Sequence, residues 1–230
     1  MTAIERGCGK PFNPLLGETF EFENDEMMSF SEQVSHHPPV CASWCKGKKA
    51  NWSIDYVQKS NSKFTGKTME FTQQYRTYLN LDDFNERVEI TMPTLSIHNL
   101  IIGTTYLDLG GESKIRILGD DELKVTLRYT RRGWLSKEEF KVEGEVVRQQ
   151  NKDSTLLYKV HGNWNSKVYV TPFVNGKVDN SQSVVVFDKS PYPEKWDYMY
   201  GMSHFSIQLN YFPNWMEDQI APTDTRRRPD

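Results

Sequence analysis

The sequence predicts an all-β protein built from antiparallel strands. Hydrophobic and polar residues alternate with a period of two over most of the 230 residues, which is the pattern of half-buried strands. Turn-forming pairs such as Asp82-Asp83 and Gly110-Gly111 separate these runs at short intervals. About a dozen short strands at this spacing indicate a meander, folded as a barrel or as a sandwich. Closing into a barrel removes exposed edges, and the residues alone leave both architectures open.

The first element in chain order is a stiff loop. Residues 7–18 contain three glycines and two prolines and therefore exclude a helix or a central strand. Lys10 brings a positive charge to this loop. The backbone N–H groups of Leu15, Leu16 and Gly17 are expected to be unpaired and to face an anion, as in a backbone nest. The alternative is a connecting loop with a solvated lysine.

Strands are predicted wherever polar and apolar residues alternate, and this alternation becomes less regular near the end of the chain. Residues 191–198 and 212–216 are expected to form turns, whereas residues 202–210 alternate and predict a further strand that could close the barrel. The three consecutive arginines at 226–228 are expected to form a solvated surface. No internal repeat or low-complexity linker occurs, so residues 1–230 are predicted to form a single domain. Strands are predicted at residues 19–23, 28–34, 40–45, 51–57, 64–71, 88–92, 104–109, 114–117, 123–129, 140–147, 156–162 and 183–187.

The stretch around which the chain is organised is residues 32–39, Glu-Gln-Val-Ser-His-His-Pro-Pro. Adjacent residues of a regular strand point to opposite faces, so His36 and His37 can serve one ligand only if the backbone leaves strand geometry. Proline lacks an N–H and restricts the residue before it, so His37 is expected to be extended and strand pairing to stop at Pro38. This arrangement puts two imidazoles at a strand end, where each can donate hydrogen bonds to an anion.

Three blocks of the sequence resemble the oxysterol-binding protein family. They are residues 32–39, the Lys-Pro-Phe-Asn-Pro-Leu-Leu-Gly-Glu string at 10–18, and the Pro-Thr-Asp-Thr-Arg-Arg-Arg-Pro-Asp string at 222–230. Their order and spacing fit the family, and the resemblance runs from Arg6 to the last residue. It implies a large, strongly curved, incomplete antiparallel β-barrel that encloses a lipid tunnel. It also implies transfer between membranes of a sterol or phosphatidylserine in exchange for phosphatidylinositol 4-phosphate.

The resemblance also implies which residues bind the lipid. Lys10, Asn13, His36 and His37 are expected to hold the phosphoinositide head group, with Leu15, Leu16 and Gly17 as backbone donors nearby. In the family, a lid precedes the first block, and a helical region after the third adds further charged ligands. The sequence starts and stops without them, as a natural short form or a fragment would. Affinity for phosphatidylinositol 4-phosphate is expected to weaken above about pH 7, as imidazoles lose their protons.

Composition restricts the other possible functions. Lysine and arginine number 28 against 31 acidic residues, and a net charge of −3 argues against nucleic-acid binding. No apolar run of about 18 residues occurs, so any membrane contact is expected to be peripheral. The protein is expected to be a cytoplasmic monomer. The chain contains three cysteines, an odd number, and they do not have the spacing of a metal site. Cys41 and Cys45 are therefore expected to be buried, reduced thiols.

Two alternative functions are weaker. A metal-dependent enzyme could use Glu32, His36 and His37, but adjacent histidines rarely chelate one ion, and no cofactor is expected. A phosphoinositide-recognising membrane module without transfer activity is a further alternative. The lysines of the 46–49 hairpin tip would touch anionic lipid if they lay near the barrel mouth. The remaining histidines, His98, His161 and His204, are expected to be packed or at the surface.

Overall fold

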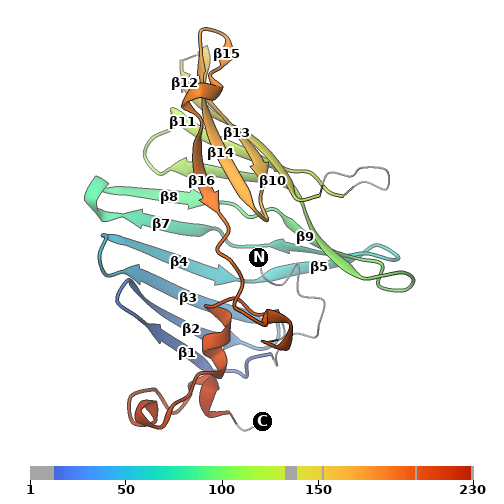
Figure 1. Ribbon diagram of the computed structural model, residues 1–230, viewed down its shortest axis with the longest axis vertical. Helices are drawn as coiled ribbons and strands as arrows, with labels where there is room; N and C mark the ends of the chain where they lie inside the picture. Colours follow the sequence, from blue (N-terminus) through green and yellow to red (C-terminus); the bar gives the residue numbers. More distant parts are fainter. Residues whose placement is uncertain (1–12, 133–138, 152, 200, 229–230) are drawn as a thin grey trace. The chain divides into compact units, whose positions relative to one another are not determined.

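The computed structural model describes residues 13–132, 139–151, 153–199 and 201–228 (Figure 1). These residues form β-strands and short 3-10 helices, and every ladder with a defined register between named strands is antiparallel. The predicted antiparallel all-β class is confirmed. The chain divides into two compact units, the first from residues 1–60, 77–85 and 191–230 and the second from residues 61–76 and 86–190. Folding as a single domain stays a prediction.

The first unit is built on a meander of neighbouring strands, with the end of the chain beside it. Its strand order is β1-β2-β3-β4-β7. The strands are β1 (Thr19–Glu23), β2 (Met27–Ser35), β3 (Val40–Gly47), β4 (Trp52–Gln58) and β7 (Thr77–Leu81), and the 3-10 helices are η1 (Asp82–Phe84), η3 (Trp196–Met199), η4 (Ser206–Asn210), η5 (Asn214–Met216) and η6 (Thr225–Arg227).

The second unit is a longer antiparallel meander. Its strand order is β8-β10-β11-β12-β13-β14-β15. In addition, β16 pairs with β14, and β9 pairs with both β6 and β10. The elements are β5 (Ser60–Phe64, which starts in the first unit), β6 (Met69–Gln73), β8 (Glu86–Ile90), β9 (Thr94–His98), β10 (Tyr106–Ile117), β11 (Leu123–Tyr129), β12 (Lys141–Gln150), β13 (Asp153–Asn163), β14 (Lys167–Val174), β15 (Lys177–Val178), η2 (Asn180–Gln182) and β16 (Val184–Asp188).

One indole ring is buried in the core of the second unit. Trp164 is 2% exposed and meets Phe140 edge to face, with ring centroids 4.9 Å apart. Val142 and Val160, on β12 and β13, are also buried. Gly162 is the residue opposite Val142, and a Cβ built there would lie 2.3 Å from the backbone oxygen of Lys167. The close approach of β14 therefore requires glycine at this position.

The end of the chain packs on one face of β1 in the first unit. The ring of Phe22 meets that of Phe205 edge to face at 5.1 Å, and the guanidinium of Arg226 lies 5.0 Å over the ring of Phe20. Residues 20 and 22 share a face of the strand. Figure 1 shows this terminal segment, in red, next to β1. The segment thereby reaches the loop that precedes β1.

Most strands predicted from alternation are present. The intervals 19–23 and 123–129 match β1 and β11 residue for residue. The predicted strand at 64–71 is wrong, because Gly66 adopts a φ of +71° and the Thr65 N–H donates to Thr68 O within a turn between β5 and β6. The turn predicted at Gly110-Gly111 is also wrong, since β10 runs through both glycines.

The strand predicted at residues 202–210 is wrong as well. Residues 206–210 form η4 instead. The Ser203 hydroxyl accepts the Ser206 N–H at 3.2 Å, and the Ile207 N–H donates to Ser203 O at 3.0 Å. A serine side chain that offers the backbone such local bonds favours a turn over a strand. The strands β7, β9, β14 and β15 were not predicted.

Candidate functional site

The paired histidines occupy a turn between β2 and β3. Ladder pairing stops at Ser35 and resumes at Val40, with an irregularity between Gln33 and Ser35. The Ser35 hydroxyl donates to Pro38 O at 2.8 Å and closes the turn. The sequence-based expectation that the backbone leaves strand geometry here is confirmed, but pairing stops at Ser35 and not, as expected, at Pro38.

The turn brings both imidazoles to one place. His36 and His37 are exposed, and their ring centroids lie 4.4 Å apart with an interplanar angle of 56°. The His37–Pro38 peptide bond is cis. Two neighbouring side chains that would lie on opposite faces of a strand are therefore available to one ligand.

The proline-rich loop docks on β2 just before this turn. The Gly17 N–H donates to Gln33 O at 2.8 Å, and the Gln33 N–H donates to Glu18 O at 3.0 Å. Gly17 has a φ of +77°, which favours glycine, and Gln33 is only 6% exposed. The loop and the histidine turn are thus joined through Gln33, whose side chain donates to Ser35 O at 2.7 Å.

The expected backbone nest needs correction. The Leu15 N–H donates to Glu18 Oε2 at 2.6 Å, because the Glu18 side chain folds back over its own turn. The Gly17 N–H is taken by Gln33 O, as strand pairing extends one step beyond β1. The expectation of three unpaired donors is therefore wrong for Leu15 and Gly17. Of the three expected donors, the Leu16 N–H alone has no partner among the described residues.

The other predicted ligands are less closely defined. Asn13 is exposed, and its carbonyl accepts from Arg228 Nη1 at 2.9 Å. Lys10 lies outside the described residues. Among the residues that are described, no group of three His, Cys, Asp or Glu side chains is placed to hold a metal ion.

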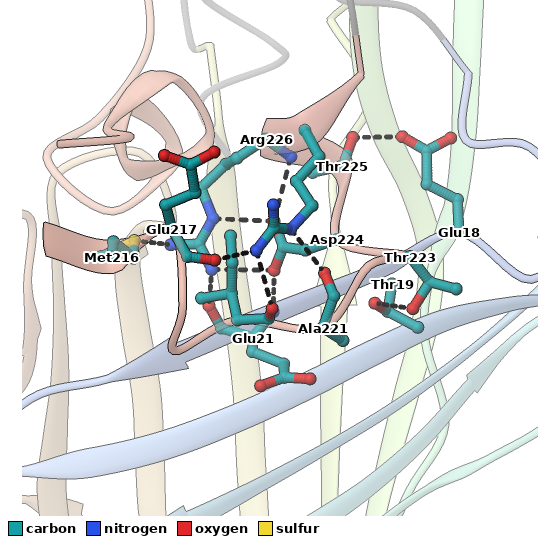
Figure 2. Close-up of polar contacts among 12 residues, drawn as sticks. Glu18, Thr19, Glu21, Met216, Glu217, Ala221, Thr223, Asp224, Thr225 and Arg226 are labelled. Atoms are coloured by element: carbon teal, nitrogen blue, oxygen red, sulfur yellow. Dashed lines mark hydrogen bonds and ion pairs between the residues drawn. The ribbon is translucent and has the colours of Figure 1, made fainter. Parts of the chain in front are cut away.

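Glu18 connects the loop to the end of the chain. Its side chain is 7% exposed, its Oε2 accepts from Arg228 Nη1 at 3.3 Å, and its Oε1 accepts from the Thr225 hydroxyl, as Figure 2 shows. A buried carboxylate with these partners is compensated, so it adds little negative potential to the proline-rich loop.

Sequence reasoning missed a buried ion pair. Arg226 donates from Nε to Asp224 Oδ1 and from Nη2 to Asp224 Oδ2, both at 2.8 Å (Figure 2), and the two side chains are 4% and 0% exposed. The solvated arginine surface is therefore wrong at Arg226. It is also wrong at Arg227 and Arg228, which are half-buried and donate to Ala221 O and Asn13 O. The sequence signal was Asp224 itself, whose carboxylate also accepts the Arg226 N–H as the N-cap of η6.

Further contacts tie this pair to β1. The Glu21 N–H donates to Asp224 Oδ2 at 3.1 Å, and Arg226 Nη2 donates to Glu21 O at 2.7 Å. Burial raises the pKa of Asp224, but the hydrogen bonds from Arg226 and from the Glu21 N–H outweigh it, and the pKa is lowered overall. The Thr19 N–H donates to Thr223 O at 2.9 Å, so the terminal segment runs along the start of β1.

The remaining side chains singled out by sequence are structural. His98 stacks on Tyr106 and His161 on Tyr169, with centroids 4.7 and 5.5 Å apart. Cys41 and Cys45 are free, but they are half-buried and not fully buried. Partial burial raises the pKa of the Cys45 thiol. The described part of the chain includes no helix long and apolar enough to cross a membrane.

Comparison with solved structures identifies the fold. The Osh1 ORD domain in complex with cholesterol matches with a TM-score of 0.80 and 26% identity, over 99% of this chain and 56% of that chain. The Osh3 ORD of Saccharomyces cerevisiae in complex with PI(4)P matches with a TM-score of 0.79 and 25% identity, over 96% and 56% of the two chains. The chain therefore has the fold of these ORD domains.

Sequence comparison identifies the family. A family model described as oxysterol-binding protein matches residues 1–230. Oxysterol-binding protein-related protein 3 of Mus musculus is 31% identical over 227 residues, and protein 1B of Arabidopsis thaliana is 31% identical over 223 residues. The chain belongs to the oxysterol-binding protein family. The matches cover 98% and 96% of this chain but only 25% and 43% of these relatives.

Proposed function

We propose that this chain is a lipid-binding and lipid-transfer module that holds a phosphoinositide by its head group at the His36–His37 turn. Its second ligand is a sterol or phosphatidylserine, and the two lipids exchange between membranes. The observation that supports this function most strongly is the convergence of the three family blocks. Residues 13–18 contact both Gln33, in the block at 32–39, and residues 225–228, all within one compact unit.

The chemistry of the turn suits a phosphate monoester. Two exposed imidazoles 4.4 Å apart can donate to neighbouring oxygens of one phosphate, and the dianion favours their protonated forms. The Leu16 N–H and the exposed Asn13 side chain add donors, and Lys10 adds a fixed charge. The Glu18 carboxylate is already bound by Thr225 and Arg228, so it does not repel the ligand.

The relatives support the ligand classes. The solved Osh ORD domains include complexes with PI(4)P, cholesterol and ergosterol. We assign the same two classes of lipid to this chain, together with a peripheral contact with membranes on the cytoplasmic side, as a monomer. The role is that of a carrier and not of an enzyme, so the extracted lipid would leave the protein chemically unchanged.

Extraction from liposomes tests this proposal. The purified chain is incubated with vesicles that contain sterol, phosphatidylserine or phosphatidylinositol 4-phosphate, and the lipid bound to protein is measured by mass spectrometry. Hydrogen bonds to a charged group contribute about 1.5–3 kcal/mol each. His36→Ala with His37→Ala is therefore expected to lower phosphoinositide affinity at least about a hundredfold.

The control is His204→Ala, another exposed histidine of the same unit, which is expected to extract lipid like the parent chain. Urea unfolding should show that the double variant keeps its stability to within about 1 kcal/mol, because both side chains are exposed. Undiminished phosphoinositide extraction by the double variant would refute the assigned site. Vesicle binding without extraction would favour a membrane-recognition module.

A further inference from the structure

Two loops of the second unit form a shared tip. One is the turn between β5 and β6 at residues 65–68, and the other joins β9 to β10 at residues 99–105. The Leu100 N–H donates to Lys67 O at 3.1 Å and holds them side by side. Figure 1 shows both beyond the ends of β5 and β9. We name this feature the paired-loop tip and define it by Lys63, Phe64, Lys67, Leu100, Ile101 and Ile102.

The base of the longer loop is fixed by hydrogen bonds. Asn99 has a φ of +59°, its Nδ2 donates to Thr104 O at 3.0 Å, and its carbonyl accepts from the Thr105 hydroxyl at 3.3 Å. In the shorter turn, the Thr65 N–H donates to Thr68 O at 2.8 Å. The three apolar residues after Asn99 are thus presented by a bonded scaffold.

The apolar side chains of the tip point into solvent. Ile102 is 83% exposed, Ile101 68%, Phe64 54% and Leu100 41%. Single exposed apolar residues are common, but a cluster of neighbours on a loop tip indicates an interaction surface. The aliphatic run Leu100-Ile101-Ile102 has no role in filling a core at these exposures.

The charge around this cluster has one sign. Residues 61–69 contain Lys63 and Lys67 and no acidic residue, and residues 91–107 contain no Asp, Glu, Lys or Arg. Both lysines are exposed. The nearest acid along β6 is Glu70, which pairs with Arg131 at 2.8 Å. In a chain of net charge −3, this local excess of positive charge suits an anionic partner.

The lysine-rich hairpin at residues 46–49 differs. Lys48 Nζ lies 2.5 Å from Glu23 Oε1, and the Lys48 N–H donates to Glu26 O, beside Asp25. Positive and negative charges therefore balance at that tip, and it carries no comparable apolar run. Membrane contact is better assigned to the paired-loop tip than to this hairpin.

We propose that the paired-loop tip docks on anionic phospholipid membranes, with its apolar side chains among the acyl chains and its lysines at the lipid phosphates. Apolar burial and attraction to anionic lipid combine at such interfaces. The inference deepens the proposed function, since a lipid carrier has to touch a membrane. It is nevertheless testable on vesicles that contain neither sterol nor phosphoinositide.

Vesicle flotation with phosphatidylcholine alone and with added phosphatidylserine measures the docking. Ile101→Ser with Ile102→Ser is expected to lower the partition coefficient about a hundredfold on both vesicles, or about tenfold per side chain. Lys63→Gln with Lys67→Gln is expected to lower it about thirtyfold on the anionic vesicles only. Raising the salt concentration should reproduce the second effect in the parent chain.

Phe84→Ser is the matched control. Phe84 is 72% exposed, but it follows Asp82 and Asp83 in η1, so its loss should leave flotation unchanged. The variant His36→Ala with His37→Ala should float normally while failing to extract phosphoinositide, which separates failure of docking from failure of the head-group site. Flotation of both tip variants at the level of the parent chain would overturn the inference, and so would a parent chain that binds neither vesicle.

Discussion

Asp224, the N-cap of η6, and Arg226, two residues further on, form a bidentate ion pair with both of its bonds at 2.8 Å and almost no solvent exposure. Such a pair is stable only when its remaining hydrogen-bonding groups are satisfied, and here the backbone of Glu21 supplies both an N–H and a carbonyl. The pair therefore attaches the end of the chain to β1, the strand that starts immediately after the proline-rich loop.

Arg226→Ala is expected to lower the free energy of unfolding by about 3–5 kcal/mol, because it leaves the buried Asp224 carboxylate without its counter-charge. Arg226→Lys should also destabilise, since an ammonium group cannot make both parallel bonds of the guanidinium. Urea unfolding followed by circular dichroism measures both. Arg128→Ala is the control, because Arg128 is 65% exposed and its pair with Glu112 should contribute less than about 1 kcal/mol. An equal loss of unfolding free energy in Arg226→Ala and Arg128→Ala would show that burial of the Arg226 ion pair does not increase its contribution to stability.

The stability of the protein is expected to fall in acid because two buried carboxyls have lowered pKa values. Hydrogen bonds from Arg116 and Arg76 hold the pKa of Glu89 below its ordinary value against the effect of burial, as the partners of Asp224 do for that residue. A carboxyl with a lowered pKa in the folded state binds its proton more readily when unfolded. Its contribution is therefore complete above the ordinary carboxyl range, about pH 4–5, and is lost as pH falls through the folded pKa.

Urea unfolding at a series of pH values from neutral to acid checks this sign. Glu89→Gln and Asp224→Asn should each make the acid-side decline less steep, although each also lowers stability at neutral pH. An acid-side slope that is identical in the parent chain and in both variants would show that other groups cause the decline.

Gly162→Ala is expected to destabilise by about 3 kcal/mol or more, because the added methyl group meets the backbone of β14 and not a flexible side chain. Its φ of +145° adds backbone strain. Gly119 provides the comparison, since its φ is +91° but nothing lies within 4 Å of a Cβ built there. Gly119→Ala should therefore cost only the strain of a positive φ, about 1–2 kcal/mol. Thermal unfolding of both variants separates steric overlap from backbone strain.

The strands that were predicted best from the sequence are those in which apolar and polar residues alternate strictly, so that one face is apolar and the other polar. Residues 19–23 and 123–129 alternate strictly and are flanked by turn residues, so both their bounds were correct. Residues 202–210 alternate too, but local bonds to Ser203 decide their conformation, and periodicity does not register such bonds. The strand β14 contains Pro172, a residue that argues against a strand in any single sequence.

The site could be predicted only where one segment determines its own geometry. The two prolines after His37 interrupt regular strand geometry between β2 and β3, so the turn and its two imidazoles were predictable, although β2 already ends at Ser35. The partners of the Leu15 and Gly17 N–H groups were not, because Glu18 folds back and Gln33 comes from another strand. The burial of Arg226 depends on contacts with residues some 200 positions earlier in the chain, for example the 205 that separate it from Glu21.

Glu18→Gln is expected to weaken phosphoinositide binding without unfolding the protein. The Glu18 carboxylate joins the proline-rich loop to Thr225 and Arg228, and an amide keeps the shape but loses the charge-assisted bonds. The loop should then be less well positioned beside the histidine turn. Hydrogen–deuterium exchange at residues 13–18 and 223–228 should increase, and phosphoinositide affinity should fall about tenfold, the effect of losing about 1.4 kcal/mol of positioning.

Glu23→Gln is the control for this prediction, because Glu23 lies at the other end of β1, is 62% exposed, and forms an ion pair with Lys48, in the turn between β3 and β4. It should leave exchange in the loop and phosphoinositide affinity unchanged. Faster exchange at residues 13–18 with unaltered affinity would mean that the loop does not contribute to the head-group site, so the histidine turn would bind its ligand alone. Loss of affinity with unaltered exchange would instead require a direct contact between Glu18 and the lipid.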